Sequence, residues 1–290
     1  MLALPAFWLG SALSARAAPQ QGEAATRIAS LNWAMSETLY ALGIKPVCAA
    51  EINGYDRLVG YPATPEGVPD VGFQGDPNLE FLSSLKPDLI LIQSWQAMAR
   101  PALERFARVE SFSIYNRGQG DPVDAAREAA TRISALAGCP DKGEALLIGT
   151  DTIFRDCATR LNRNGDRAVL LVQALSPTNL VVFTGGSLFD SVMKRIGLTN
   201  AWSRPPTLLW GSTQIGVDAL ADYPDADIVW MASPDGGTSQ ALFKSDLWRQ
   251  LPQVANGAVR QLPLVWGFGA LPTAERFARL ITAQLTGIAG

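Results

Sequence analysis

Two tryptophans beside glycines are the residues of this sequence best placed to contact a ligand. The segments Trp210-Gly211-Ser212 and Trp266-Gly267-Phe268-Gly269 interrupt helix and strand periodicity, because glycine exposes the backbone and frees its conformation. Packing in a core is the alternative role for such side chains, but binding residues concentrate on loops held by a rigid scaffold. An aromatic side chain can bury on the order of 150–250 Å². We therefore expect Trp210 and Trp266 to line a binding cleft.

Histidine is absent from all 290 residues of the sequence. A serine nucleophile normally needs an imidazole base, and sites for free zinc commonly use imidazole ligands. The sequence also lacks a Gly-x-Ser-x-Gly segment, the usual setting of a serine nucleophile in hydrolases. These observations argue against an enzyme and against a receptor for free zinc or manganese.

The overall charge and the cysteine count exclude other classes of function. A net charge of −3 leaves no basic excess to neutralise a phosphate backbone, so nucleic acid is not an expected partner. The three cysteines, Cys48, Cys139 and Cys157, form no CxxC pair and indicate no zinc knuckle. Buried thiols are the favoured interpretation. A Cys139–Cys157 bridge stays open if the protein works in an oxidising compartment.

The first 18 residues are typical of a secretory signal peptide. They are apolar and end in the small-residue pattern Ala15-Arg16-Ala17, and the apolar stretch is too short to span a membrane. No basic residue precedes that stretch, which is consistent with a true start upstream of Met1. No cysteine follows the expected cleavage site, so a lipid anchor is not indicated. We predict export to a Gram-negative periplasm with residues 1–18 removed.

Residues 26–139 have the pattern of an α/β lobe. The continuous apolar run 89–92 directly follows an amphipathic helix that ends at a proline, which is typical of a parallel strand covered on both faces. A glycine ends the first expected helix. The predicted elements are strands at 27–31, 47–50 and 89–92, and helices at 36–43 and 77–85.

A long amphipathic helix is predicted at 140–164, and a second α/β lobe at 165–290. Apolar residues between 146 and 161 recur at three- and four-residue spacing, with Pro140 before them and Asn164-Gly165 after them. The expected elements beyond are strands at 168–173, 179–183 and 228–231, and helices at 187–196 and 217–221. The sequence therefore predicts an α/β protein of two Rossmann-like lobes with central sheets, joined by a single long helix that disfavours large hinge closure.

These features together resemble the substrate-binding proteins of the helical-backbone class, which serve iron-siderophore and cobalamin importers. The marker segments are 27–33 with Glu37, 41–46, 70–72, 77–80, 85–88 and 200–202. Within that class the chain most resembles the periplasmic ferric-hydroxamate (ferrichrome-type) binding proteins. That closer similarity depends on residues 182–189, 209–213 and 265–270.

The resemblance implies a shallow aromatic cleft between the lobes. Trp210 and Trp266 match two tryptophans that contact the siderophore in that family, and Phe268 stands where a tyrosine is usual. Gln74 and Gln96 replace an arginine and a tyrosine that bind hydroxamate oxygens, so the preferred siderophore is expected to differ. The candidate ligand-binding residues are Trp33, Gln74, Trp95, Gln96, Trp210, Ser212, Trp266 and Phe268.

The predicted function is that of a periplasmic receptor for a ferric hydroxamate-type siderophore. A ferric trihydroxamate is neutral and its iron already has six oxygen ligands, so the protein needs apolar area and a few hydrogen bonds but no cofactor. The expected partners of this monomer are an inner-membrane ABC permease and its ATPase. Cobalamin or haem is the alternative ligand, and a siderophore-processing enzyme is the alternative class.

Two acidic residues and one glycine-containing segment can each be interpreted either as structural or as functional. The resemblance implies that one carboxylate on each lobe docks on the permease, and Glu104 and Asp218 are the candidates, although surface acids are usually only solvated. The segment Thr184-Gly185-Gly186-Ser187 lacks the lysine of a phosphate loop. We expect it to form a tight turn in which Ser187 caps the following helix.

Overall fold

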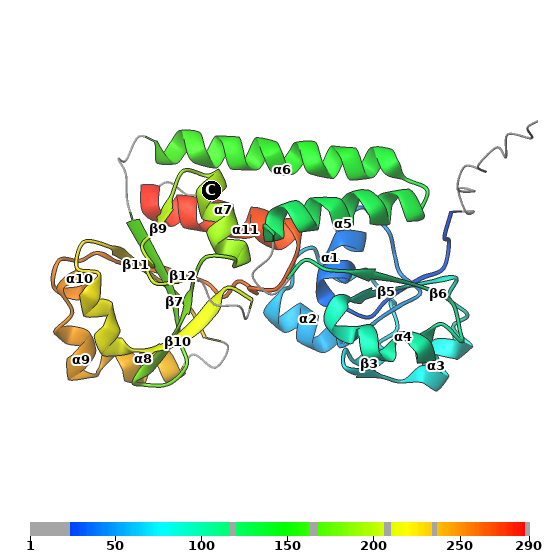
Figure 1. Ribbon diagram of the computed structural model, residues 1–290, viewed down its shortest axis with the longest axis horizontal. Coiled ribbons are helices and arrows are strands. Elements are labelled where there is room, and N and C mark those ends of the chain that lie inside the picture. Colours follow the sequence, from blue (N-terminus) through cyan, green and yellow to red (C-terminus); the bar gives the residue numbers. More distant parts are fainter. Residues whose placement is uncertain (1–23, 116–119, 163–167, 206–209, 234–236, 288–290) are drawn as a thin grey trace, which may run out of the picture.

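The structure is a computed structural model that describes residues 24–115, 120–162, 168–205, 210–233 and 237–287. The predicted signal peptide, residues 1–18, lies outside the described residues. Two α/β lobes lie side by side, and the long helix α6 (Pro140–Leu161) crosses above both of them (Figure 1). We call the part of the chain before α6 the N-terminal lobe and the part after it the C-terminal lobe.

The N-terminal lobe is built on a four-stranded sheet in the order β2-β1-β5-β6. All three pairings are parallel, and every residue of β5 is buried, as the apolar run 89–92 predicts. Its elements are β1 (Ile28–Ser30), α1 (Trp33–Ala41), β2 (Cys48–Ala49), α2 (Ile52–Leu58), β3 (Gly72–Phe73), β4 (Asp76–Pro77), α3 (Leu79–Ser84), β5 (Leu89–Gln93), the 3₁₀ helix η1 (Ser94–Ala99), α4 (Arg100–Leu103), β6 (Arg108–Phe112) and α5 (Pro122–Leu136).

The first helix begins three residues earlier than the sequence pattern predicts. Asn32 has an extended backbone, and its side chain accepts a hydrogen bond from the backbone N–H of Ala34, so Asn32 is the N-cap of α1. The helix ends as predicted, because Gly43 takes the left-handed conformation just beyond it. The earlier start places Trp33 in the first turn, beside the end of β1.

The C-terminal lobe has a mixed sheet in the order β10-β8-β7-β11-β12, with β9 also paired to β7. Strand β8 runs antiparallel to both of its neighbours, whereas β11 is parallel to β7 and β12. Its elements are β7 (Ala168–Ala174), β8 (Asn179–Phe183), α7 (Leu188–Arg195), β9 (Thr199–Asn200), β10 (Ser212–Gly216), the 3₁₀ helix η2 (Val217–Asp222), β11 (Asp227–Met231), α8 (Gly237–Phe243), α9 (Asp246–Arg249), α10 (Pro252–Ala255), β12 (Val259–Leu262) and α11 (Leu271–Thr286).

The two lobes share one hydrophobic core. Its buried side chains come from both sheets and from α1, α5, α6, α7 and α11. Helix α11, the last in the chain, packs against α6 and α7 and also against α1 and α5 of the N-terminal lobe. The predicted division at 26–139, 140–164 and 165–290 stays a prediction, but a common core leaves little freedom for the lobes to move apart.

The three cysteines are free thiols in the structure. Cys139 is the N-cap of α6 and Cys157 lies within the same helix, 18 residues further on. At 1.5 Å of rise per residue their α-carbons are about 27 Å apart, several times the span of a disulfide. The bridge that the sequence left open is therefore excluded by the helix itself.

None of the helices in the described part of the chain is both long enough and apolar enough to cross a membrane.

A polar network joins the start of α5 to helix α7 of the C-terminal lobe. Asp121 caps α5 by accepting hydrogen bonds from the backbone N–H groups of Val123 and Asp124. The same carboxylate pairs with Arg195 (2.9 Å) and accepts a hydrogen bond from the hydroxyl of Ser191 (2.5 Å). One carboxylate thus serves as a helix cap and as a tie between the lobes.

We expect Asp121→Ala to lower the free energy of unfolding by about 1–2 kcal/mol at neutral pH, because it removes a cap and a partly exposed ion pair. Burial opposes ionisation of Asp121, but hydrogen bonds from Arg195 and Ser191 outweigh it and lower its pKa. A lowered pKa stabilises the fold above about pH 4, and this contribution is lost as the pH falls through the folded-state pKa.

Urea denaturation at pH 6 and pH 3 tests this prediction. The difference between the wild type and Asp121→Ala should be smaller at pH 3. Asp246→Ala, which removes an exposed ion pair, is the control and should have little effect. A loss that is the same at both pH values would show that the ion pair contributes nothing.

Candidate ligand-binding site

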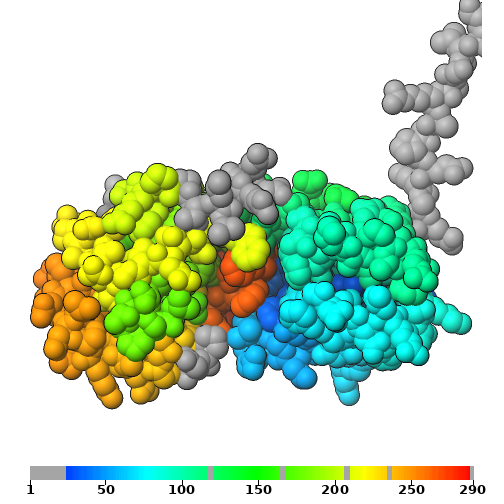
Figure 2. Space-filling model, turned by 60° about the horizontal axis from the view of Figure 1, so that its bottom comes forward, coloured from blue at the N-terminus to red at the C-terminus, as the bar shows by residue number. Residues whose placement is uncertain are grey.

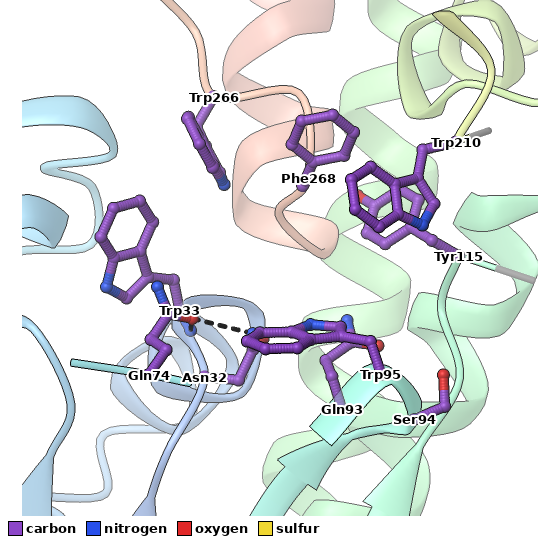
Figure 3. Close-up of a pocket in the computed structure, with 10 residues that line it drawn as sticks. All are labelled: Asn32, Trp33, Gln74, Gln93, Ser94, Trp95, Tyr115, Trp210, Trp266 and Phe268. Carbon is purple, nitrogen blue, oxygen red and sulfur yellow. Dashed lines mark hydrogen bonds between the residues drawn. The ribbon is translucent and has the colours of Figure 1, made fainter. Parts of the chain in front are cut away.

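A cavity lies at the junction of the lobes. Its volume is about 230 Å³, and about 720 Å³ when the space that opens to solvent at its mouth is included. Figure 2 shows the junction as a hollow, with the orange-red segment that follows β12 at its floor. The lining residues, shown in Figure 3, are Asn32, Trp33, Gln74, Gln93, Ser94, Trp95, Tyr115, Trp210, Trp266 and Phe268.

Phe268 is the centre of an aromatic cluster that both lobes build. Its ring contacts those of Trp210, Trp266 and Tyr115 edge-on, with centroids 5.3, 5.5 and 5.7 Å apart. Trp266 in turn meets Trp33 of the N-terminal lobe at 5.1 Å. Edge-to-face pairs at these distances are the favoured aromatic geometry. The contacts fix the rings against one another and leave their outer faces toward the cavity.

The backbone at Trp210 holds its indole out into the cavity. Trp210 and Gly211 both have positive φ angles, 54° and 67°. The N–H of Thr184 donates to the carbonyl of Gly211 (2.7 Å), and a Cβ at Gly211 would lie 2.0 Å from the nitrogen of Ser187. Only glycine allows this close approach. The indole of Trp210 stays 47% exposed as a result, which is unusual for so large an apolar side chain.

The turn beneath Gly211 is the predicted Thr184-Gly185-Gly186-Ser187 turn. Gly186 has a φ of 84°, and the Ser187 hydroxyl accepts a hydrogen bond from the backbone N–H of Asp190 at 3.1 Å. The predicted capping role of Ser187 is therefore confirmed.

The N-terminal lobe supplies a polar wall of amide side chains. Asn32 donates through Nδ2 to Oε1 of Gln74 (2.9 Å; dashed in Figure 3), which also accepts from the backbone N–H of Trp33 (3.3 Å). The Nε2 of Gln74 donates to Oε2 of Glu51 (3.2 Å). This network fixes which atoms of Asn32 and Gln74 face outward, so the wall presents neutral hydrogen-bonding groups.

Gln96 is not among the lining residues, and its role as a ligand contact stays a prediction. Its side chain is 6% exposed and accepts from the backbone N–H of Gln93, while Nε2 donates to the carbonyls of Leu31 (2.8 Å) and Gln74 (2.7 Å). The three partners belong to the three loops that form the polar wall. Gln96 therefore supports the site from behind, since a buried amide must satisfy its hydrogen bonds within the protein.

Ser212 is likewise absent from the lining. It is the first residue of β10 and pairs with Phe183 of β8, two positions beyond Trp210. Residues i and i+2 share a face only where the chain is extended, and here the backbone of Trp210 and Gly211 turns through positive φ angles before β10 begins.

The two predicted docking residues are exposed, one on each lobe. Glu104 follows α4 and pairs with Arg100 at 2.7 Å, with each side chain 46% exposed. Asp218 lies in the first turn of η2. Neither lines the cavity, and their docking role stays a prediction.

Four lining residues were missed by the sequence analysis: Asn32, Gln93, Ser94 and Tyr115. All four stand at or just after the carboxyl ends of β1, β5 and β6. Because these strands are parallel, their carboxyl ends meet at one edge of the sheet, where α/β proteins bind ligands. The order of the strands in the sheet, which the sequence pattern does not contain, is the signal needed to find them.

The described lining contains no charged side chain, and no group of three or more potential metal ligands occurs in the described part of the chain. Glu51 lies behind the lining, where its carboxylate accepts a hydrogen bond from the side chain of Gln74. Burial raises the pKa of Tyr115 well above its usual value, and the charge of Glu37 adds to this shift, so its hydroxyl is neutral. The cavity is suited to a neutral, largely apolar ligand.

A second hollow lies between α2 and the β12–α11 loop, but its character is different. Its lining includes Asp56, Arg57, Glu275, Arg276 and Arg279. Arg276 is already engaged, since it donates to the backbone carbonyl of Val59 (2.6 Å). The aromatic cavity is therefore the better candidate for ligand binding.

Two α/β lobes bridged by one long helix, with a preformed aromatic cavity at their junction, define a substrate-binding protein that holds a small molecule between its lobes. A family model for periplasmic binding proteins matches residues 28–264, and the chain belongs to this family. It is accordingly a binding protein and not an enzyme.

The relatives include proteins that handle different iron complexes. The chain is 32% identical to the iron(3+)-hydroxamate-binding protein FhuD of Escherichia coli over 262 residues, which cover 90% of this chain and 87% of the relative. It is 24% identical to the Fe(3+)-citrate-binding protein YfmC of Bacillus subtilis, covering 80% and 71%. The crystal structure of FhuD from Vibrio cholerae with bound Fe3+-Desferal superposes with a TM-score of 0.85 at 28% identity, covering 91% and 99%.

Gly211→Ala should distort the Trp210 side of the cavity. The added methyl would collide with the backbone of Ser187 and strain a left-handed residue, so we expect a loss of about 2 kcal/mol or more in the free energy of unfolding. Gly257→Ala is the matched control, because Gly257 has nearly the same φ (66°) but open space around its Cβ. Its loss should be near 1 kcal/mol. Urea denaturation compares the two, and equal losses would exclude the proposed close contact.

Proposed function

We propose that this protein captures a ferric siderophore of the hydroxamate type in the aromatic cavity and delivers it to an inner-membrane ABC permease. The observation that carries the proposal is the lining itself, in which four tryptophans, a phenylalanine and a tyrosine surround neutral amide groups with no charged side chain. A ferric trihydroxamate matches such a surface, because its iron is saturated by six oxygens and the iron–hydroxamate core has no net charge.

The relatives support the hydroxamate class. The Escherichia coli relative is named for iron(3+)-hydroxamate, and the Vibrio cholerae structure contains Fe3+-Desferal, a linear trihydroxamate complex. The neutral donors of Asn32, Gln74 and Ser94 are suited to the amide and hydroxamate oxygens of such a ligand. The aromatic rings are suited to its carbon chains.

Anionic iron complexes fit the cavity less well. The catecholate-siderophore binding protein VctP of Vibrio cholerae has the same fold, at 17% identity and a TM-score of 0.69. The fold alone therefore does not select the ligand. A triscatecholate carries three negative charges and calls for convergent cations, and the described lining contains none. The carboxylate of Glu51 behind Gln74 would repel each negative charge by on the order of 1 kcal/mol.

Haem is a weaker candidate for a specific reason. Without histidine, a tyrosine would have to bind the iron, and Tyr115 is the tyrosine of the described lining. Its hydroxyl donates to the carbonyl of Gly269 at 2.5 Å, and burial raises its pKa, so it is poorly suited to act as a phenolate ligand. No described feature favours cobalamin.

Delivery of the ligand to the permease requires that the outer surfaces of both lobes dock on it. We infer that the protein works as a monomer in the periplasm and that Glu104 and Asp218 meet basic residues of the permease. Both side chains are exposed and belong to different lobes, as docking across the mouth of the cavity requires. The ATPase on the far side of the membrane is the expected source of energy for transport.

Tryptophan fluorescence tests the proposal directly. Ferric desferrioxamine B and ferrichrome should quench the emission strongly, because bound iron complexes would lie beside four tryptophans. Trp266→Ala should raise Kd for the better ligand at least tenfold, since it removes a large aromatic contact. Trp202→Phe, which lies outside the described lining and stacks on Tyr223, is the control and should leave Kd unchanged. Quenching by haem or cobalamin alone would contradict the hydroxamate assignment.

The charge preference is testable with three forms of one ligand. Ferric desferrioxamine B carries a terminal ammonium group, its N-acetyl form is neutral at that end and its N-succinyl form ends in a carboxylate. We expect the succinyl form to bind most weakly at low salt, and Glu51→Gln to reduce the difference. The measurement is Kd by fluorescence at 20 mM and 500 mM salt. Tightest binding by the succinyl form would contradict the electrostatic argument.

A further inference from the structure

A fully buried carboxyl group crosses the junction between the lobes behind the cavity. Glu37 belongs to α1 of the N-terminal lobe and is 0% exposed. Its Oε1 accepts a hydrogen bond from the backbone N–H of Ala270, and its Oε2 accepts one from the hydroxyl of Thr273 at 2.6 Å. Both partners belong to the start of α11 in the C-terminal lobe, so one side chain of α1 completes the N-terminus of a helix more than 200 residues away in the sequence.

A second side chain holds the same turn. Tyr115, which follows β6, donates its hydroxyl to the carbonyl of Gly269 at 2.5 Å. The fit around Gly269 is tight, because a Cβ there would lie 2.2 Å from Oγ1 of Thr273 and 2.7 Å from Oε1 of Glu37. Two side chains of the N-terminal lobe therefore bind two consecutive residues of the C-terminal lobe.

This turn directly continues the aromatic wall of the cavity. Phe268 precedes Gly269, and Trp266 lies two residues further back. The ring of Phe268 also packs against that of Tyr115. The segment 266–268 is a loop between β12 and α11, so its position depends on what fixes its two ends.

We propose that Glu37 is a positioning residue that fixes the 266–270 segment and thereby shapes the aromatic side of the ligand cavity. The inference rests on the proposed function, because it concerns the affinity of the same cavity. If this turn moved, the buried N–H of Ala270 would lose its hydrogen bond to Glu37 and be left unsatisfied. The rings of Trp266 and Phe268 are therefore held in place before the ligand binds. Such preorganisation raises affinity by removing an ordering cost from the binding step.

The protonation state of Glu37 supports this role. Burial raises its pKa to about 8 despite hydrogen bonds from Thr273 and Ala270, and the charge of Glu275 on α11 adds to the rise. The other titratable groups coupled to it are the neutral phenols of Tyr55 and Tyr115. At pH 7 the group is therefore mainly a neutral acid, with one oxygen to accept from Ala270 and one hydroxyl to share with Thr273. A glutamine has the same shape and can make the same two hydrogen bonds.

The test compares Glu37→Leu with Glu37→Gln in the full-length protein. With ferric desferrioxamine B as the probe, Glu37→Leu should raise Kd at least tenfold, and Glu37→Gln should recover most of that loss. Hydrogen exchange followed by mass spectrometry, without ligand, should show faster exchange in the peptide covering 265–272 for the leucine variant only. Glu144→Gln is the control, since the side chain of Glu144 is exposed on α6, and it should change neither measurement.

The outcomes separate this inference from the proposed function. If the wild type binds no ferric siderophore, the proposed function fails, and the exchange of residues 265–272 still decides the role of Glu37. If Glu37→Leu binds as tightly as the wild type with unchanged exchange, the inference is overturned. Should the leucine variant fail to fold, Thr273→Val removes one of the two hydrogen bonds. It should raise both Kd and the exchange rate, and a null result in that variant would also overturn the inference.

Discussion

The continuous hydrophobic core that runs through both lobes is the constraint on which the rest of the structure depends. Side chains of both sheets and of α1, α5, α6, α7 and α11 are buried in one cluster, and the long helix α6 covers the junction. Because interiors are packed as tightly as crystals, the lobes keep one relative position. A cavity between them can then be preformed, with rings from one lobe resting on rings from the other.

The cavity must keep large aromatic side chains exposed, although their burial would be more favourable. An apolar ligand surface needs large exposed aromatic side chains, yet water favours their burial. The structure meets both by edge-to-face contacts around Phe268 and by positive φ angles at Trp210 and Gly211, which turn the indole of Trp210 outward. Polar groups on the opposite wall are tied to one another through Gln74 and Gln96, so they are rigid as well.

The sequence predicted the fold class well because its evidence is local. The apolar run 89–92 and the spacing from 146 to 161 require only neighbours along the chain, and strand β5 and helix α6 lie there. The site was predicted in part. Trp210 and Trp266 stand out by their glycines, whereas Tyr115 becomes a lining residue only through the order of the strands. Gln96 and Ser212 lie outside the lining for the converse reason, since matching positions along the chain say nothing about which way a side chain turns.

Helix α11 also has a consequence for the order in which the protein can fold. The N-terminal lobe is synthesised first, but part of the core that covers α1 and α5 comes from the last helix of the chain. Contacts over such sequence separations form slowly, because a long loop must close before they can stabilise anything. The N-terminal lobe therefore stays incomplete until α11 has been synthesised and has packed against it.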